Sequence, residues 1–127
     1  MTARLLASRD AIAAALTAGG VRVATTAKFS APCAILEPGD PWAAVDLSLG
    51  RKRTGRWRLT LVAGQADSAG AHDTLAELVD LADAALLALP GVELPTWAMP
   101  FDRTLAGIPY AATVATIQYM TAQLEEV

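Results

Sequence analysis

Histidine and cysteine are nearly absent from this sequence of 127 residues, which has one of each, His72 and Cys33. A single cysteine excludes an internal disulfide framework and a zinc site built on cysteines. Metal sites and acid–base pairs draw on several convergent groups, and one histidine leaves only scattered carboxylates to join it. We therefore expect His72 to be an ordinary exposed residue and Cys33 to be a small buried side chain on a strand.

Long apolar runs are also missing. The most apolar stretch, residues 84–89, is stopped by Pro90 and Gly91 and is far too short to span a bilayer. Arg4 and Arg9 interrupt the apolar positions near the start of the sequence, which therefore lacks the core of a signal peptide. These features predict a soluble, cytoplasmic protein without a membrane partner.

Sequence signatures of catalysis and nucleotide binding are missing too. The glycines at 50, 55, 64 and 70 fall in expected turns without the spacing of a phosphate-binding loop. No loop has the alternating oxygen ligands of an EF-hand. A nucleophile pair of Cys33 and His72 is formally open, but no local signature supports it. We predict that the chain is not an enzyme and uses no cofactor or metal.

Apolar residues make up 54% of the sequence, and many of them are alanines. This fraction is enough for one folded domain over residues 1–127.

The charges are unevenly distributed along the sequence. Residues 1–58 hold nine Lys/Arg against four Asp/Glu, a net charge of +5, and residues 59–127 hold one, Arg103, against nine, a net charge of −8. This split suits an assembly in which one part of a copy meets a different part of the next.

The first half of the sequence predicts one helix and several strands. A helix is expected from Ser8 as its N-cap to the glycines at 19–20. Short strands are expected over residues 21–23 and 33–37. The sequence Pro-Gly-Asp-Pro at 38–41 predicts a turn, because proline fixes φ and glycine supplies a positive φ.

A hairpin is predicted next, because apolar and polar residues alternate over residues 45–49 and 57–61. The sequence GRKRTGRWR, residues 50–58, places five positive charges in this hairpin. Three of them are expected at its tip: Arg51, Lys52 and Arg53. Two are expected on its outer face: Arg56 and Arg58.

A long helix is predicted over residues 71–89 from its apolar stripe. A second hairpin follows over residues 95–122, with its turn at Ala106-Gly107, and its last strand alternates poorly, which a bulge or burial of both faces would explain. This order predicts an α+β fold: a mostly antiparallel sheet with an N-terminal helix and one long helix packed on it. The side of the long helix away from the apolar stripe is acidic: Asp73, Glu77, Asp80 and Asp83.

The three tryptophans divide into two groups. Trp57 has the apolar parity of its strand and is expected in the core. Trp42 and Trp97 follow prolines, at 41 and 95, and are candidates for exposed aromatic anchors of an interface.

The basic cluster has three interpretations at this point. It could be a solvated hairpin end, a contact to an acidic surface of a neighbouring copy, or a contact to DNA phosphates. Aromatic residues within the cluster are limited to Trp57, and the chain is acidic overall, with a net charge of −3.

Six segments in a fixed order form a pattern over nearly the whole chain. They are Gly-Gly-Val-Arg-Val at 19–23, Glu-Pro-Gly-Asp-Pro-Trp at 37–42, Arg-Trp-Arg-Leu-Thr-Leu-Val-Ala-Gly at 56–64, Gln-Ala-Asp-Ser at 65–68, Leu-Ala-Glu-Leu-Val-Asp at 75–80 and Leu-Ala-Gly-Ile-Pro-Tyr-Ala-Ala-Thr-Val at 105–114. In this order the sequence resembles the tail terminator (tail completion, or neck) proteins of long-tailed bacteriophages, especially those of actinobacterial hosts.

The resemblance implies a virion protein at the tail–head interface, assembled in the host cytoplasm. Six copies would form a ring that caps the tail tube and ends its polymerisation. The other ring face would meet the head-completion (stopper) protein, and double-stranded DNA would pass through the lumen. Two alternatives stay open: another head–tail joining component, or a small nucleic-acid-binding module that uses residues 51–58.

The resemblance assigns no role to the basic hairpin tip. The charge split leads to a hypothesis of its own: in a head-to-tail ring, the basic hairpin of one copy lies near the acidic helix face of the next. Such an interface gives a closed ring only if the rotation from copy to copy closes.

Overall fold

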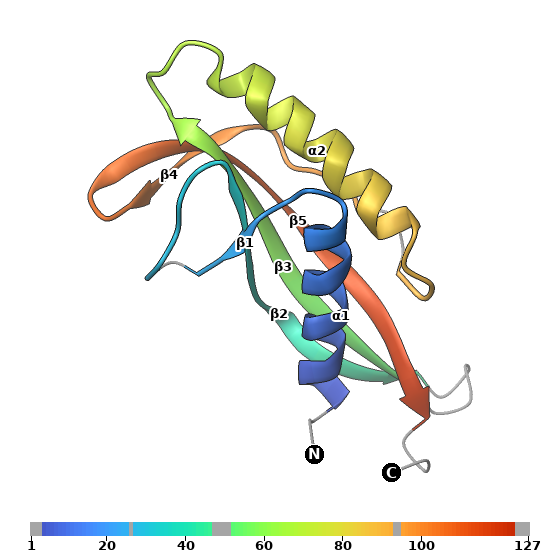
Figure 1. Ribbon diagram of the computed structural model, residues 1–127. Helices are drawn as coiled ribbons and strands as arrows, with labels where there is room; N and C mark the ends of the chain where they lie inside the picture. The colour runs from blue at the N-terminus through green and yellow to red at the C-terminus, as the bar shows by residue number, and fades with distance from the viewer. Residues whose placement is uncertain (1–3, 26, 47–51, 93–94, 124–127) are drawn as a thin grey trace.

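The fold is α+β, with two helices and a five-stranded mixed sheet that is mostly antiparallel (Figure 1). It is seen in a computed structural model that describes residues 4–25, 27–46, 52–92 and 95–123. The elements in chain order are α1 (Arg4–Ala18), β1 (Val23–Ala24), β2 (Cys33–Asp46), β3 (Lys52–Gln65), α2 (Ala71–Leu87), β4 (Phe101–Leu105) and β5 (Ile108–Gln123). The strand order is β1-β2-β3-β5-β4; β1 and β2 are parallel, and the other neighbours are antiparallel.

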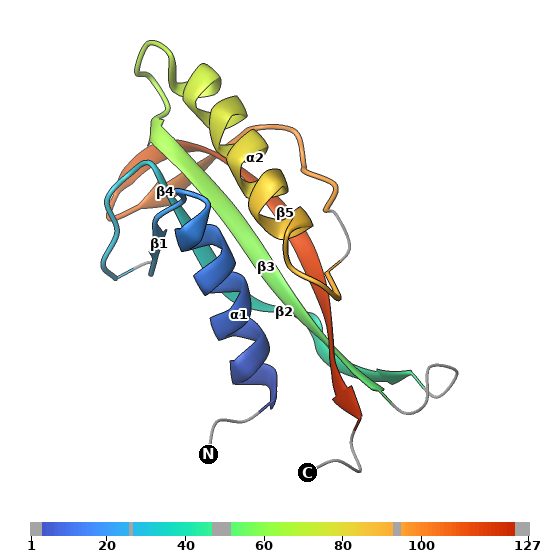
Figure 2. The ribbon, with the colours of Figure 1, turned by 45° about the vertical axis from the view of Figure 1, so that its right-hand side comes forward.

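Both helices cover the same face of the sheet (Figures 1 and 2), and the main core lies between them and this face. Trp57, Leu59 and Leu61 of β3 alternate toward the helices and are at most 2% exposed. The predicted stripe of α2 supplies the opposite side of the core, with Leu75, Leu78, Ala82 and Leu86 all buried. Each fully buried leucine contributes about 1.5–3 kcal/mol of hydrophobic stabilisation. The prediction of α2 and of its apolar face is confirmed, although the helix ends at Leu87.

The helix-free face of the sheet has a smaller core of its own: Cys33, Ile35, Val62, Leu105 and Ala112. Above it Arg103 of β4 reaches across the sheet. Its guanidinium donates to Glu37 of β2 at 3.0 and 3.3 Å and to Thr60 of β3 at 3.1 Å. Because β5 and β3 lie between β4 and β2, these contacts require the sheet to curl over this face.

The start of α1 corrects one prediction. The helix already includes Arg4, so Ser8 lies inside it and is not its N-cap. Ser8 is 1% exposed, and its Oγ accepts a hydrogen bond of 2.9 Å from the indole Nε1 of Trp57. A serine therefore occupies a core position because it pairs with a buried indole. The predicted end of the helix is confirmed, since α1 ends at Ala18, just before the two glycines.

The second correction concerns residues 38–41, where the predicted turn is absent. The strand continues through it, and β2 runs from Cys33 to Asp46 with a shift of register between Pro38 and Ala43. Prolines remove ladder hydrogen bonds and bend a strand without ending it. Gly39 permits the bend, because a Cβ there would lie 2.9 Å from the carbonyl oxygen of Arg56. The result is a long projection of the sheet that extends beyond α2 (Figures 1 and 2). We call residues 38–46 and 52–58 of this projection the arm; β5 pairs with β3 along it.

The turn predicted for the second hairpin is confirmed, and its first strand is shorter than predicted. Ala106 and Gly107 have φ values of 53° and 79°, as a two-residue turn of the hairpin type requires. β4 begins at Phe101, and residues 95–100 are not part of it. The poor alternation of β5 has one of the two causes that were considered, since the consecutive residues Ala111 to Thr113 are all buried. The register of β3 with β5 shifts between Val62 and Gly64, but the extra residue there is on β3, so it does not change the alternation of β5.

Candidate subunit interface

The basic residues of the hairpin that the structure describes lie along the arm. Lys52 and Arg53 open β3, paired with Asp46 and Val45 of β2, so they adjoin the hairpin connection as predicted. Arg51 falls outside the described residues. Arg58 is exposed and lies opposite Glu37 on β2 and Thr116 on β5. The basic residues are therefore carried along one end of the molecule.

Arg56 and Arg58 are on the outer face, as predicted, because their neighbour Trp57 points to the helices. Arg56 is half-buried. Its Nη1 is shielded from solvent and has no hydrogen-bond partner among the described residues. A buried charged donor without an acceptor is costly, by about 1–3 kcal/mol or more.

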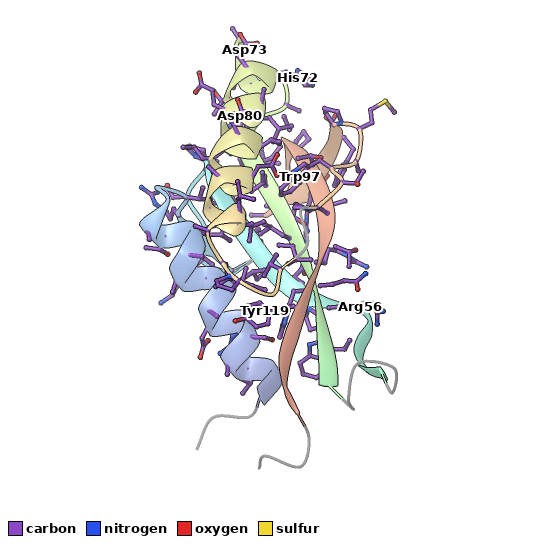
Figure 3. All side chains as sticks on the ribbon, turned by 90° about the vertical axis from the view of Figure 1, so that its right-hand side faces the viewer. Arg56, His72, Asp73, Asp80, Trp97 and Tyr119 are labelled. Atoms are coloured by element: carbon purple, nitrogen blue, oxygen red, sulfur yellow. The ribbon has the colours of Figure 1, made fainter. Side chains whose placement is uncertain are left out.

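The acidic residues of α2 form an exposed surface, with one exception. Asp73, Glu77 and Asp80 are exposed, whereas Asp83 is half-buried and accepts a hydrogen bond of 2.9 Å from the indole Nε1 of Trp97. Figure 3 shows Asp73 and Asp80 at one end of the molecule and Arg56 toward the other. The ion pairs found among the described residues are Arg9–Asp10 and Arg103–Glu37. Within one copy, Arg56 and Arg58, the basic residues of the hairpin whose side chains the structure describes, form no ion pair with the acids of α2.

The two tryptophans proposed as exposed anchors have different surroundings. Trp42 is 41% exposed, and its ring meets that of Trp57 edge to face, with centroids 5.6 Å apart. Trp97 is half-buried and packs against the main core, so it differs from the exposed anchor that was expected. Trp57 is 2% exposed, as predicted for a core residue.

A groove that the sequence did not predict lies between α2 and the segment before β4. We call it the α2 groove. Its volume is about 280 Å³, and it is lined mainly by apolar side chains. Two hydrogen bonds hold the outer wall: Ala98 N–H donates to the Val114 carbonyl at 2.9 Å, and the Thr113 hydroxyl donates to the Ala98 carbonyl at 2.6 Å. The lining residues are His72, Leu75, Ala76, Val79, Asp80, Trp97, Ala98, Pro100 and Thr113.

The candidates for chemistry are separated by the sheet. His72 is exposed and borders the α2 groove on the helix side, whereas Cys33 is buried on the helix-free side. Burial raises the pKa of the Cys33 thiol, and a backbone hydrogen bond at Ser30 and the charge of Arg22 offset part of this effect. The two residues therefore do not form a nucleophile pair. In the part of the chain that the structure describes, no three His, Cys, Asp or Glu residues gather in a group that could hold a metal.

The helices in the described ranges are too short or too polar to cross a bilayer. No model of a known protein family matches the chain, and no curated protein matches it either.

Proposed function

We propose that the protein is a structural subunit of a head-to-tail ring, and that the ring is the terminator of a bacteriophage tail. The observation that supports a ring is that the acidic and basic surfaces of one copy lie apart. An exposed acidic surface on α2 and a basic arm lie toward opposite ends of one copy, as Asp73 and Arg56 illustrate in Figure 3. Two such ends cannot meet within a copy, but they can meet between copies.

The proposed contact is heterologous: the arm of one copy approaches the acidic surface of the next. Complementary charge of this kind accelerates encounter and selects the partner and orientation. The same surface would repel a symmetric contact of arm with arm, because like charges would face each other. Repetition of a heterologous contact gives a ring where the rotation closes. The number of copies, six, and the tail tube as a partner come from the sequence resemblance.

In this function the ring caps the tail tube, stops its polymerisation and presents its other face to the head-completion protein. DNA passes through the lumen without being held, and the work is done by binding surfaces. The second candidate, a nucleic-acid-binding module, has one observation in its favour, the exposed Arg58 on the helix-free face. It predicts retention on double-stranded DNA that falls steeply with salt, with a slope set by the number of phosphates contacted.

Native mass spectrometry across a concentration series, with negative-stain images of any large species, tests the proposal. A closed six-fold ring, formed by the chain alone or on added tail tubes, is the expected result. A strict monomer in both conditions that is retained on DNA would overturn it and favour the nucleic-acid module.

Charge reversal tests the proposed contact. Reversal of Arg51 and Arg53 to glutamate should weaken assembly, and additional reversal of acids on α2 should partly restore it. Unchanged assembly after the first reversal would refute pairing through these charges.

A further inference from the structure

We propose that the outer side of α2 of one copy packs against the helix-free face of the sheet of the next copy. This inference rests on the proposed head-to-tail ring and assigns its contact to two surfaces of the subunit. Both helices lie on one side of the sheet (Figures 1 and 2), so these two surfaces point away from each other. They can meet only between copies.

The helix-free face is basic. Val23 packs against the main core, so alternation along the chain turns its neighbour Arg22 to the helix-free side. Arg22 and Lys28 both line an open hollow of about 470 Å³ beside β1. Arg58 lies on the same side of the sheet in β3, and all three side chains are exposed. Three cations are therefore accessible from this side.

Within the described part of the copy, these three cations form no ion pair. Among the strand residues whose side chains the structure describes, Glu37 is the acid on this face, and Arg103 already neutralises it through contacts of 3.0 and 3.3 Å. Asp102 alternates with Arg103 and therefore points to the other side. The excess positive charge of the helix-free face is thus available to an acidic surface of another molecule.

The outer side of α2 carries the opposite charge. Positions 73, 77, 80, 84 and 87 are spaced by four and three residues, so they lie in one row along the helix. The row is opposite the buried stripe, and all five of its residues are exposed. We call it the outer row: Asp73, Glu77, Asp80, Ala84 and Leu87. Apart from His72, α2 contains no basic residue, so the outer row keeps its negative charge.

Apolar side chains are exposed on both surfaces as well. Leu87, at the end of the outer row, is 72% exposed. On the sheet, Phe101 and Ile108 are 39% and 38% exposed. They share the helix-free face with Ala112 and Leu105, their direct partners across the hairpin, which belong to the core of that face. A contact between the two surfaces would join complementary charges and also remove apolar area from water, which adds to the small contribution of exposed charge pairs.

Double-stranded DNA is the other polyanion that three exposed cations could contact. Two observations favour a second copy. The chain has a net charge of −3, so its overall field repels DNA. Every copy also carries one basic and one acidic surface, so each contact of a closed ring can be made with the same pair of surfaces.

Zero-length carbodiimide cross-linking tests the contact, because the chain has only two lysines, Lys28 and Lys52. The reagent joins an amine to a carboxylate only where the two groups are in contact. Wild-type assemblies, alone or on added tail tubes, are prepared from equal amounts of ¹⁵N-labelled and unlabelled chains, cross-linked, digested and read by mass spectrometry. Mixed-isotope peptides identify links between copies, and the expected ones join Lys28 to acids of the outer row. Links from Lys52 to these acids without links from Lys28 would refute packing on the helix-free face.

Charge reversal on each surface gives a second readout. Arg58→Glu alters the helix-free face, and Glu77→Lys alters the outer row. The matched controls are Arg9→Glu and Asp10→Lys, which make the same charge changes at positions of α1 whose side chains are 45% and 59% exposed. Native mass spectrometry measures the concentration at which each full-length variant assembles, and circular dichroism melting verifies folding.

Arg58→Glu and Glu77→Lys should each raise the concentration needed for assembly at least five-fold, while the two controls assemble as the wild type does. An equimolar mixture of Arg58→Glu and Glu77→Lys should assemble at a lower total concentration than either variant alone. In the mixture, an intact basic face meets an intact outer row, and the two reversed charges also face each other.

The possible failures are distinguishable. If the wild type assembles, no link from Lys28 forms and Arg58→Glu assembles like Arg9→Glu, the ring stands and this contact is wrong. If the wild type never assembles, alone or on tubes, the proposed ring fails and this contact fails with it. A wild-type monomer that is retained on double-stranded DNA and released by Arg58→Glu, but not by Arg9→Glu, would assign the basic face to DNA instead. Should Arg58→Glu not fold, the cross-links of the wild type still decide the question.

Discussion

Ser8 and Trp57, 49 residues apart in the chain, are joined by a hydrogen bond of 2.9 Å in which the indole Nε1 donates to the serine hydroxyl. Both residues are nearly inaccessible to solvent, at 1% and 2% exposure. The bond links α1 to the middle strand of the sheet at the base of the arm. It thereby connects the packing of the first helix with the position of the aromatic pair Trp57 and Trp42.

Ser8→Ala should lower the free energy of unfolding by about 1–3 kcal/mol, because the buried indole N–H would lose its acceptor. The substitution removes one oxygen and favours the helix, so backbone effects cannot account for a loss. Urea unfolding followed by tryptophan fluorescence measures the change. Ser68→Ala, at an exposed serine, is the control and should change stability by less than about 0.5 kcal/mol. An equally small effect of Ser8→Ala would show that this bond does not stabilise the fold.

The contact of Arg103 with Glu37 should stabilise the curl of the sheet measurably. The side chains are 23% and 34% exposed, and the pair has two N–O contacts at 3.0 and 3.3 Å. Because the pair is partly buried and has two hydrogen bonds, it should stabilise the fold more than a surface ion pair does. A double-mutant cycle with Arg103→Met and Glu37→Gln should therefore give a coupling free energy of about 1–2 kcal/mol. The same cycle on Arg9 and Asp10, which are 45% and 59% exposed, should give less than about 0.5 kcal/mol. Equal coupling in the two cycles would contradict this explanation.

The sequence predicts those features of the fold that depend on local pattern. The apolar stripe of α2, the alternation around Trp57 and the turn at Ala106-Gly107 each follow from a few neighbouring residues, and all three are present. Features that depend on distant partners were not predictable in this way. Ser8 resembles an N-cap until Trp57 is known to lie against it.

The features of the candidate interface also differ in whether a local sequence pattern predicts them. The exposure of Arg58 and of most acids on α2 follows from periodicity, and it is observed. The α2 groove was missed because its outer wall is an irregular segment, residues 97–100, whose path depends on Thr113 and Val114 of a later strand. The half-burial of Trp97 has the same cause, since Asp83 lies on the helix beside it. The two prolines at 38 and 41, with glycine between them, would have been the available signal for the bulge that carries Trp42.

Gly39→Ala should destabilise the arm, because the new Cβ would lie 2.9 Å from the backbone oxygen of Arg56 and 3.1 Å from its Cβ. Backbone atoms of a paired strand cannot move aside easily, and overpacking of this kind costs about 1–3 kcal/mol. Gly64→Ala, in the same sheet, is the matched control, since nothing lies within 4 Å of a Cβ there. Thermal unfolding of the two variants should therefore differ clearly in Tm. If the two variants melt together, strands β2 and β3 are not in close contact at the bulge.

Cys33 should make stability fall as the pH rises into the alkaline range. Burial raises the pKa of its thiol in the folded state, so the folded protein holds this proton more tightly than the unfolded chain does. A raised folded pKa contributes stability that is fully present below the unfolded pKa, about 8.5, and is lost as the pH rises through the folded pKa. In this window the loss of unfolding free energy approaches about 1.4 kcal/mol per pH unit for one proton.

Other groups also titrate in this pH range. The quantity to measure is therefore the difference in the free energy of unfolding between wild type and Cys33→Ala, from urea unfolding under reducing conditions at pH 7.5 to 10. The two curves should converge as the pH rises, because the variant has no thiol to ionise. A constant difference over this range would mean that the folded and unfolded thiols ionise alike, and that Cys33 is not shielded from solvent by the helix-free face.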